Sequence, residues 1–192
     1  MSRPLLALLL GPALLAQAPA GLKLGDPVPA FRLPGTDGRE HGPVPGNQPL
    51  LVVFLSTECP YVMATQGRIA AYARHYAGRV QVLAINANDV DTHARESLAD
   101  MKAQAASQGF AFPYLKDAAQ AVTRAFGAVC TPDFFLFDGR GRLAYRGRMD
   151  DSWRDAAKVT VRDLETATEA LLAGRPVAVE QVPSRGCSIK WK

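Results

Sequence analysis

Residues 50–55 are a continuous apolar run, and no other feature of the 192-residue chain restricts its fold as strongly. Such a run predicts a strand buried on both faces, as in a parallel sheet. Residues 60–76 then carry apolar side chains at helical spacing, and residues 79–86 form a second apolar, β-branched run. Together the three segments predict a β–α–β unit with parallel strands and a right-handed crossover.

Cys59 lies where the first strand passes into the helix, and Pro60 suits a first helical turn because that turn does not need its missing N–H. Free N–H groups and the helix dipole favour a thiolate there. Glu58 opposes this effect, because a neighbouring carboxylate raises a thiol pKa. Val62 occupies the place where a CxxC motif has its second cysteine. We predict that Cys59 is reactive; the alternative is a small buried hydrophobe.

Three more helices are predicted after the second strand. The first begins at Ser97, whose spacing to Asp100 is that of a capping box, and it ends near residue 109. A short helix spans residues 118–126. The last begins at Thr160, with Asp163 at the same capping distance.

Further strands complete an α/β pattern. Residues 110–117 predict a short edge strand, while residues 134–137 and 143–146 flank the turn DGRG as an antiparallel hairpin. Residues 21–49 are rich in Gly and Pro and predict an irregular cover, with one short hairpin around Asp37. The order βαβ, helix, ββα gives a central mixed sheet flanked by helices in one domain, residues 21–174.

Residues 1–20 differ from the rest. Arg3 precedes a short apolar run and then small residues, with A-x-A sites ending at Ala18 and Ala20. The run is shorter than the about 20 residues that span a bilayer. We predict a signal peptide, export to the periplasm or outside the cell, and no stable membrane insertion; the alternative is an apolar helix packed on the domain.

Charge and cysteine content exclude several classes of function. The net charge of +4 comes from single Lys and Arg residues among Asp and Glu, without the basic runs of a nucleic-acid surface. Cys59, Cys130 and Cys187 lie far apart, so no compact metal site and no cofactor are predicted. Three cysteines in an oxidising compartment imply one pair plus a leftover, or an intermolecular pair, which leaves a homodimer open.

Several strings, in this order, resemble a bacterial subgroup of redoxins, the AhpC/TSA-type, peroxiredoxin-like proteins of the thioredoxin-like superfamily: CPYV, AINAND, GAVCTPDFFLFD, YRGRMDD and GCSIKWK. The resemblance covers residues 21–174 and leaves residues 175–192 as a polar, mobile tail carrying Cys187. It implies a thioredoxin-like fold with a cis-proline, Pro132, beside Cys59, where substrate chains pair with backbone.

The resemblance also implies a thiol-dependent oxidoreductase. The Cys59 thiolate would attack a disulfide or a peroxide, and a second thiol would resolve the product before a thiol reductant restores the enzyme. Cys130, two residues before Pro132, and Cys187, placed like the distant resolving cysteine of peroxiredoxins, both remain candidates. The alternatives are that Cys130 is a buried packing thiol and that Cys187 is incidental.

Other site residues follow from the same resemblance. The peroxiredoxin pattern PxxxTxxC has Val52 and Ser56 in place of its Pro and Thr, so Ser56, with Thr57 beside it, is the hydroxyl candidate. The remaining candidates flank the cysteines or are cations able to stabilise a thiolate: Pro60, Tyr61, Thr131, Arg146 and Arg148. Asp150 and Asp151 are the expected partners of the two arginines.

Two other functions stay open. One is a peroxiredoxin-like antioxidant peroxidase. The other is a non-enzymatic thiol- or copper-binding protein using Cys59 with Cys130, although Met63 stands where copper-binding relatives have the second cysteine of CxxxC.

Overall fold

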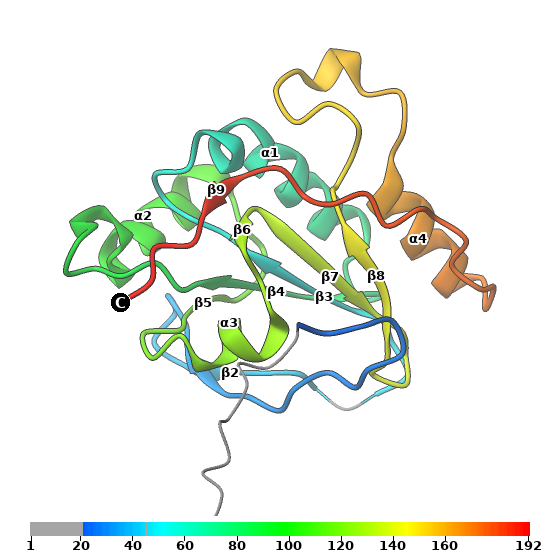
Figure 1. Cartoon of the computed structure of the whole chain (residues 1–192), viewed down its shortest axis with the longest axis horizontal. Coiled ribbons are helices and arrows are strands. Elements are labelled where there is room, and N and C mark those ends of the chain that lie inside the picture. Colours follow the sequence, from blue (N-terminus) through cyan, green and yellow to red (C-terminus); the bar gives the residue numbers. More distant parts are fainter. Residues whose placement is uncertain (1–20, 45) are drawn as a thin grey trace, which may run out of the picture.

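A five-stranded mixed sheet forms the centre of the computed structural model, which describes residues 21–44 and 46–192 (Figure 1). The three strands on one side are parallel, and the two on the other side join as an antiparallel hairpin. In sheet order the strands are β5 (Tyr114–Lys116), β4 (Gln81–Asn86), β3 (Leu50–Phe54), β7 (Asp133–Phe137) and β8 (Leu143–Gly147). The predicted β–α–β unit and the hairpin are confirmed.

Helices cover both faces of the sheet, because every residue of β3 is buried and its side chains alternate between two cores. Leu51 and Val53 belong to the core under α1 (Pro60–His75), α2 (Leu98–Gln108) and α4 (Asp163–Leu172). The other three residues of β3 belong to the core under α3 (Ala121–Phe126) and the N-terminal segment. Figure 1 shows α1 and α2 above the sheet and α3 below it.

One of the two predicted helix caps is confirmed. The Ser97 hydroxyl accepts the Asp100 N–H at 3.2 Å at the start of α2. The cap at Thr160 is wrong, since α4 begins three residues later without a side-chain cap. Thr160 instead donates its N–H (2.9 Å) and its hydroxyl to Asp151 of the preceding loop. These bonds hold Thr160 in the loop, so its hydroxyl does not cap the helix.

The smaller elements attach both ends of the described chain to the sheet. β1 (Leu33–Pro34) and β2 (Glu40–His41) form the predicted short hairpin, and two 3₁₀ helices span Ala94–Glu96 and Ala156–Lys158. β6 (Cys130–Thr131) pairs with β9 (Cys187–Ser188), so the tail that was expected to be mobile lies along the domain (Figure 1).

The predicted signal peptide, residues 1–20, lies outside the described residues. Among the residues that are described, no helix has the length and apolar character needed to cross a membrane.

Candidate active site

Cys59 caps the N-terminus of α1 and is only 2% exposed. The antiparallel register pairs Phe54 with Asp133, which brings the residues after β3 beside the residues before β7. As a result, the Cys59 Sγ lies 2.9 Å from the Thr131 carbonyl, to which it donates as a thiol. The Thr131–Pro132 peptide bond is cis, the isomer that the resemblance implies.

Cys187 reaches the same place from the tail. In the β6–β9 ribbon it lies directly opposite Thr131. The approach is close at Gly186, where a Cβ atom would lie 2.1 Å from the Thr131 carbonyl oxygen, so only glycine fits before Cys187. Cys187 then packs against the apolar cluster that contains Cys59.

Cys130 is turned away from this pair. Its Sγ faces the Pro132 carbonyl at 3.6 Å and the Ser184 carbonyl at 3.8 Å, as expected for neighbouring residues of a strand, whose side chains project in opposite directions. Burial and the Asp133 carboxylate raise the pKa of Cys130 to about 12. Cys187 therefore lies opposite Thr131 and packs against the cluster that contains Cys59, whereas the Cys130 thiol faces two carbonyls. All three cysteines are free thiols.

The two facing thiols differ in acidity. Burial raises the pKa of Cys59, but hydrogen bonds from the Thr131 side chain, the Cys187 thiol and N–H, and the Val62 N–H outweigh burial and leave it below that of an ordinary cysteine. Burial and donation to Cys59 raise the pKa of Cys187 to about 11. The pKa of Cys59 is thus lower than that of Cys187.

This arrangement predicts a specific effect of Cys187 on Cys59. In the wild-type protein, alkylation of Cys59 by iodoacetamide should reach half its maximal rate at a lower pH than in an unfolded peptide of residues 56–62, because the folded site stabilises the thiolate. Cys187→Ala should move that midpoint upward, and Cys130→Ala should leave it in place. Peptide mapping of the alkylated protein measures both. A midpoint that stays unchanged in Cys187→Ala would contradict the assignment.

Ser56 and Thr57 hold the loop before Cys59 in place. The Ser56 hydroxyl accepts the N–H groups of Glu58 and Cys59, each at 3.1 Å, and donates to Glu96 at 2.5 Å. Thr57 donates its N–H to the same carboxylate at 3.0 Å. Both hydroxyl residues therefore lie at the site, but the Ser56 hydroxyl is already occupied by protein partners.

The sequence analysis did not identify Glu96. Its carboxylate is 1% exposed and also accepts the side-chain amides of Asn86 (2.6 Å) and Asn88 (2.9 Å). The Lys116 Nζ lies next to it, bonded to the Glu96 carbonyl at 2.8 Å. Burial raises the pKa of Glu96, yet the hydrogen bonds prevail and hold it below its usual value. The string AINAND could have indicated a buried polar partner, because it places the amides of Asn86 and Asn88 at the end of a buried strand.

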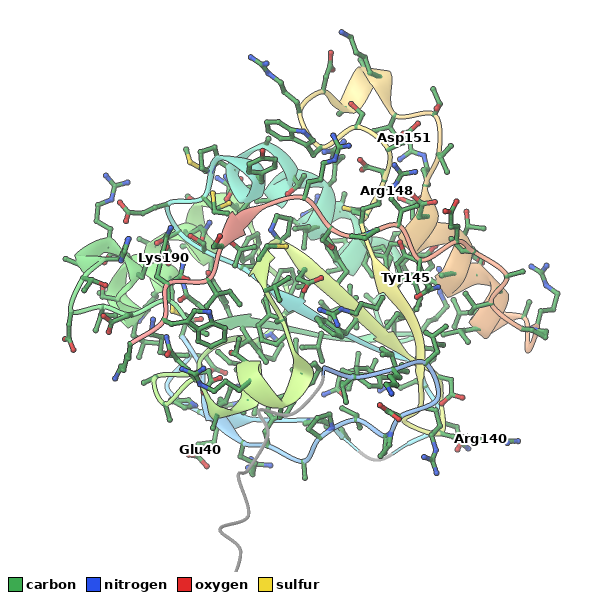
Figure 2. The ribbon with its side chains drawn as sticks, in the orientation of Figure 1. Glu40, Arg140, Tyr145, Arg148, Asp151 and Lys190 are labelled. Atoms are coloured by element: carbon green, nitrogen blue, oxygen red, sulfur yellow. The ribbon has the colours of Figure 1, made fainter. Side chains whose placement is uncertain are left out.

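The two predicted arginines have other partners than expected. Arg146 pairs with Asp133 across the hairpin at 3.4 Å, and Arg148 pairs with Asp163 at the start of α4 at 2.6 Å. Figure 2 shows Arg148 and Asp151 on the segment that leaves β8. The prediction of Asp150 and Asp151 as partners is wrong, because elements packed across the sheet supply closer carboxylates than the neighbouring sequence does. Among the described residues, neither guanidinium hydrogen-bonds the Cys59 sulfur.

Asp150 pairs instead with Arg68 of α1 at 3.2 Å. Of the remaining candidates, Pro60 is exposed at the first turn of α1. The Tyr61 ring packs against that of Trp153, with the ring centroids 4.1 Å apart. Tyr61 is two residues after Cys59, so this ring pair connects the first turn of α1 to the loop that carries Trp153.

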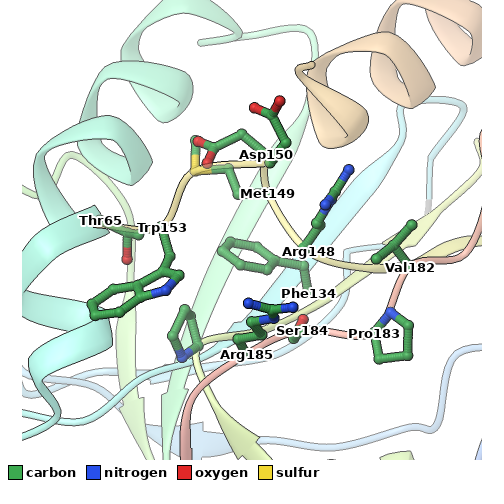
Figure 3. Close-up of a pocket in the computed structure, with 12 residues that line it drawn as sticks. Thr65, Phe134, Arg148, Met149, Asp150, Trp153, Val182, Pro183, Ser184 and Arg185 are labelled. Carbon is green, nitrogen blue, oxygen red and sulfur yellow. The ribbon is translucent and has the colours of Figure 1, made fainter. Parts of the chain in front are cut away.

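A cavity of about 120 Å³ lies beside Pro132. Figure 3 shows Thr65 and Trp153 on one side of it and Val182 and Pro183 of the tail on the other. Phe134 and Met149 line the cavity and also belong to the apolar cluster that buries Cys59. The cavity therefore borders the apolar cluster that contains Cys59, while its lining includes neither Cys59 nor Cys187.

The Redoxin family matches residues 23–168. A hypothetical protein from Sinorhizobium meliloti is 42% identical, with a TM-score of 0.85, over 90% of this chain and 97% of that one. An uncharacterized conserved protein from Geobacillus kaustophilus is 38% identical, with a TM-score of 0.82. The match covers 92% of this chain and 94% of the Geobacillus chain. A secreted disulfide oxidoreductase from Mycobacterium tuberculosis shares the fold, with a TM-score of 0.52 and 17% identity. The match covers 59% of this chain and 79% of the mycobacterial chain. No curated protein matches the sequence.

Proposed function

The chain belongs to the Redoxin family, and from this premise we propose that it is a thiol–disulfide oxidoreductase in which Cys59 attacks and Cys187 resolves. Its thioredoxin-like redox role follows from the family; the assignment of the two thiols and of the substrate is the proposal. One observation carries it: Cys187 lies opposite Thr131 in the β6–β9 ribbon, and the Thr131 carbonyl is 2.9 Å from the Cys59 Sγ.

The proposed reaction has two exchanges. The Cys59 thiolate attacks one sulfur of a disulfide R–S–S–R, which forms a mixed disulfide and releases RS⁻. The Cys187 thiol gives its proton to a departing thiolate and attacks the Cys59 Sγ, which releases the second RS⁻. The protein then holds a Cys59–Cys187 disulfide, and a thiol reductant returns the two electrons that the substrate received.

The surroundings of Ser56 argue against a peroxiredoxin-like role for this residue. A peroxidase of the peroxiredoxin kind needs a free hydroxyl near the sulfur, and Ser56 was the candidate. Its hydroxyl donates to Glu96 and accepts two N–H groups. Ser56 therefore supports the loop and does not offer a hydrogen bond to a peroxide.

We also propose that the protein is exported, since residues 1–20 have the pattern of a signal peptide. One structural neighbour is described as secreted. An oxidising compartment suits a dithiol that cycles through a disulfide.

Disulfide mapping tests the thiol assignment. Mild oxidation of the wild-type protein with diamide should join Cys59 to Cys187, because Cys187 lies opposite Thr131, whose carbonyl contacts the Cys59 Sγ. Cys130→Ser should keep this bond, and Cys187→Ser should lose it without forming Cys59–Cys130. Non-reducing digestion and mass spectrometry identify the bonds. A dominant Cys59–Cys130 bond in the wild-type protein would overturn the proposal.

A further inference from the structure

We infer that the docked tail restricts the proposed thiol site to low-molecular-weight disulfides and closes it to disulfides of folded proteins. The inference rests on the proposed function of Cys59. It concerns what occupies the backbone edge beside the sulfur.

That edge is already paired. An extended protein segment binds an exposed strand edge through its main chain, and the edge of β6 next to Pro132 is the one nearest Cys59. In this structure β9 fills it, with Thr131 opposite Cys187 and Cys130 opposite Ser188. The Ile189 N–H continues the pairing to the Val129 carbonyl at 3.2 Å. An incoming chain needs the same backbone groups and must first displace the tail.

The tail is anchored beyond β9. Lys190 donates its N–H to the Asn88 side chain at 2.8 Å, and its carbonyl accepts the Gln120 amide at 2.9 Å. The Lys192 N–H also bonds to Gln120, at 3.0 Å. The Ile189 side chain is 3% exposed and belongs to the core under α3 and the N-terminal segment. Displacement would therefore break several hydrogen bonds and expose an apolar side chain.

The tail is equally fixed before β9. Ser184 donates its hydroxyl to the Gly147 carbonyl at 2.7 Å, and the Arg148 N–H bonds to the Val182 carbonyl at 2.9 Å. Gly186 then crosses Thr131 at a separation that a Cβ atom would not tolerate. Contacts on both sides of Cys187 thus hold β9 in place as the strand that pairs with β6.

What remains open suits a small molecule. The cavity beside Pro132 has about 120 Å³, less than the roughly 300–1,000 Å³ of sites for drug-sized ligands. Cys59 itself is 2% exposed, so a substrate sulfur must enter the site to reach it. A small disulfide can do so with the tail in place, whereas a disulfide held in a folded surface cannot.

The test uses Gly186→Ala in the full chain, with Cys187→Ser in every protein so that the product stays as a mixed disulfide on Cys59. The matched control is Gly67→Ala on the exposed side of α1, where an added Cβ has no neighbour within 4 Å. The probes are bis(2-hydroxyethyl) disulfide and insulin, and mass spectrometry follows the modification of Cys59. Trypsin cleavage after Arg185 and Lys190 reports displacement of the tail.

Gly186→Ala should accelerate tail cleavage and lower the preference for the small disulfide over insulin at least tenfold, while Gly67→Ala should change neither. A peptide of residues 184–192, with serine for Cys187, should restore the preference when added to the Gly186→Ala protein, which also shows that this protein remains folded. An unchanged preference, with or without faster tail cleavage, overturns the inference. If Cys59 of the parent Cys187→Ser protein reacts with neither probe, the proposed function itself fails.

Discussion

Cys59→Ser should reduce the turnover of bis(2-hydroxyethyl) disulfide by about a thousandfold or more, to the rate of the reductant alone. A serine hydroxyl is not ionised near neutral pH and cannot form the mixed disulfide through which exchange proceeds. The measurement is dithiothreitol-driven release of 2-mercaptoethanol, followed with the wild-type and variant proteins at equal concentration.

Cys130→Ser is the matched control, because it makes the same atomic change at a thiol that faces the Pro132 and Ser184 carbonyls instead of Cys59. It should retain turnover within about threefold, as expected for a thiol outside the exchange steps. Substantial turnover by Cys59→Ser, or loss of turnover in Cys130→Ser alone, would show that another thiol attacks.

Glu96→Ala should lower the free energy of unfolding by about 3–5 kcal/mol, the range for removing one partner of a buried charged network. The substitution leaves the donors of Ser56, Thr57, Asn86 and Asn88 without their acceptor. It also removes the carboxylate that attracts the adjacent Lys116 ammonium most strongly. Urea unfolding, followed by circular dichroism, measures the change.

Glu58→Ala provides the comparison. Its carboxylate pairs with Arg95 at 3.1 Å, but the side chains are 36% and 76% exposed, so the loss should stay below about 1 kcal/mol. Equal losses in the free energy of unfolding for the two substitutions would argue against a buried hydrogen-bond network centred on Glu96.

The contribution of Glu96 should also depend on pH. Its carboxyl pKa is lower in the folded protein than in the unfolded chain, so the stabilisation is fully present above the unfolded pKa. It is lost as pH falls from that value through the folded pKa. The stability difference between wild type and Glu96→Ala should therefore shrink on acidification over this interval.

Local patterns were sufficient to predict the framework. The buried strand at residues 50–55, the helix that Cys59 opens and the cap at Ser97 each depend on residues close in sequence, and all three are confirmed. The redoxin resemblance, which depended on several motifs in order, is confirmed by the family match over residues 23–168. The narrower subgroup remains a prediction.

Long-range pairing explains what the sequence analysis left open. β6 and β9 have two residues each, too few to show a strand periodicity, so nothing local indicated that Cys187 would face Thr131. Glu96 was missed for a related reason. Its partners come from β4 and from the loop after β3. The local sequence around Glu96 does not distinguish a buried carboxylate from an exposed one in a polar loop.

The pairing of β6 with β9 has a consequence for how the protein is made. β6 is synthesised after α1, α2 and α3, but β9 follows only after α4 and the segment beyond it. A nascent chain can therefore expose Cys59 while Cys187 is still inside the ribosome. During that interval Cys59 lacks the partner that we propose for it, and an oxidant would join it to a thiol of another nascent chain in an intermolecular disulfide.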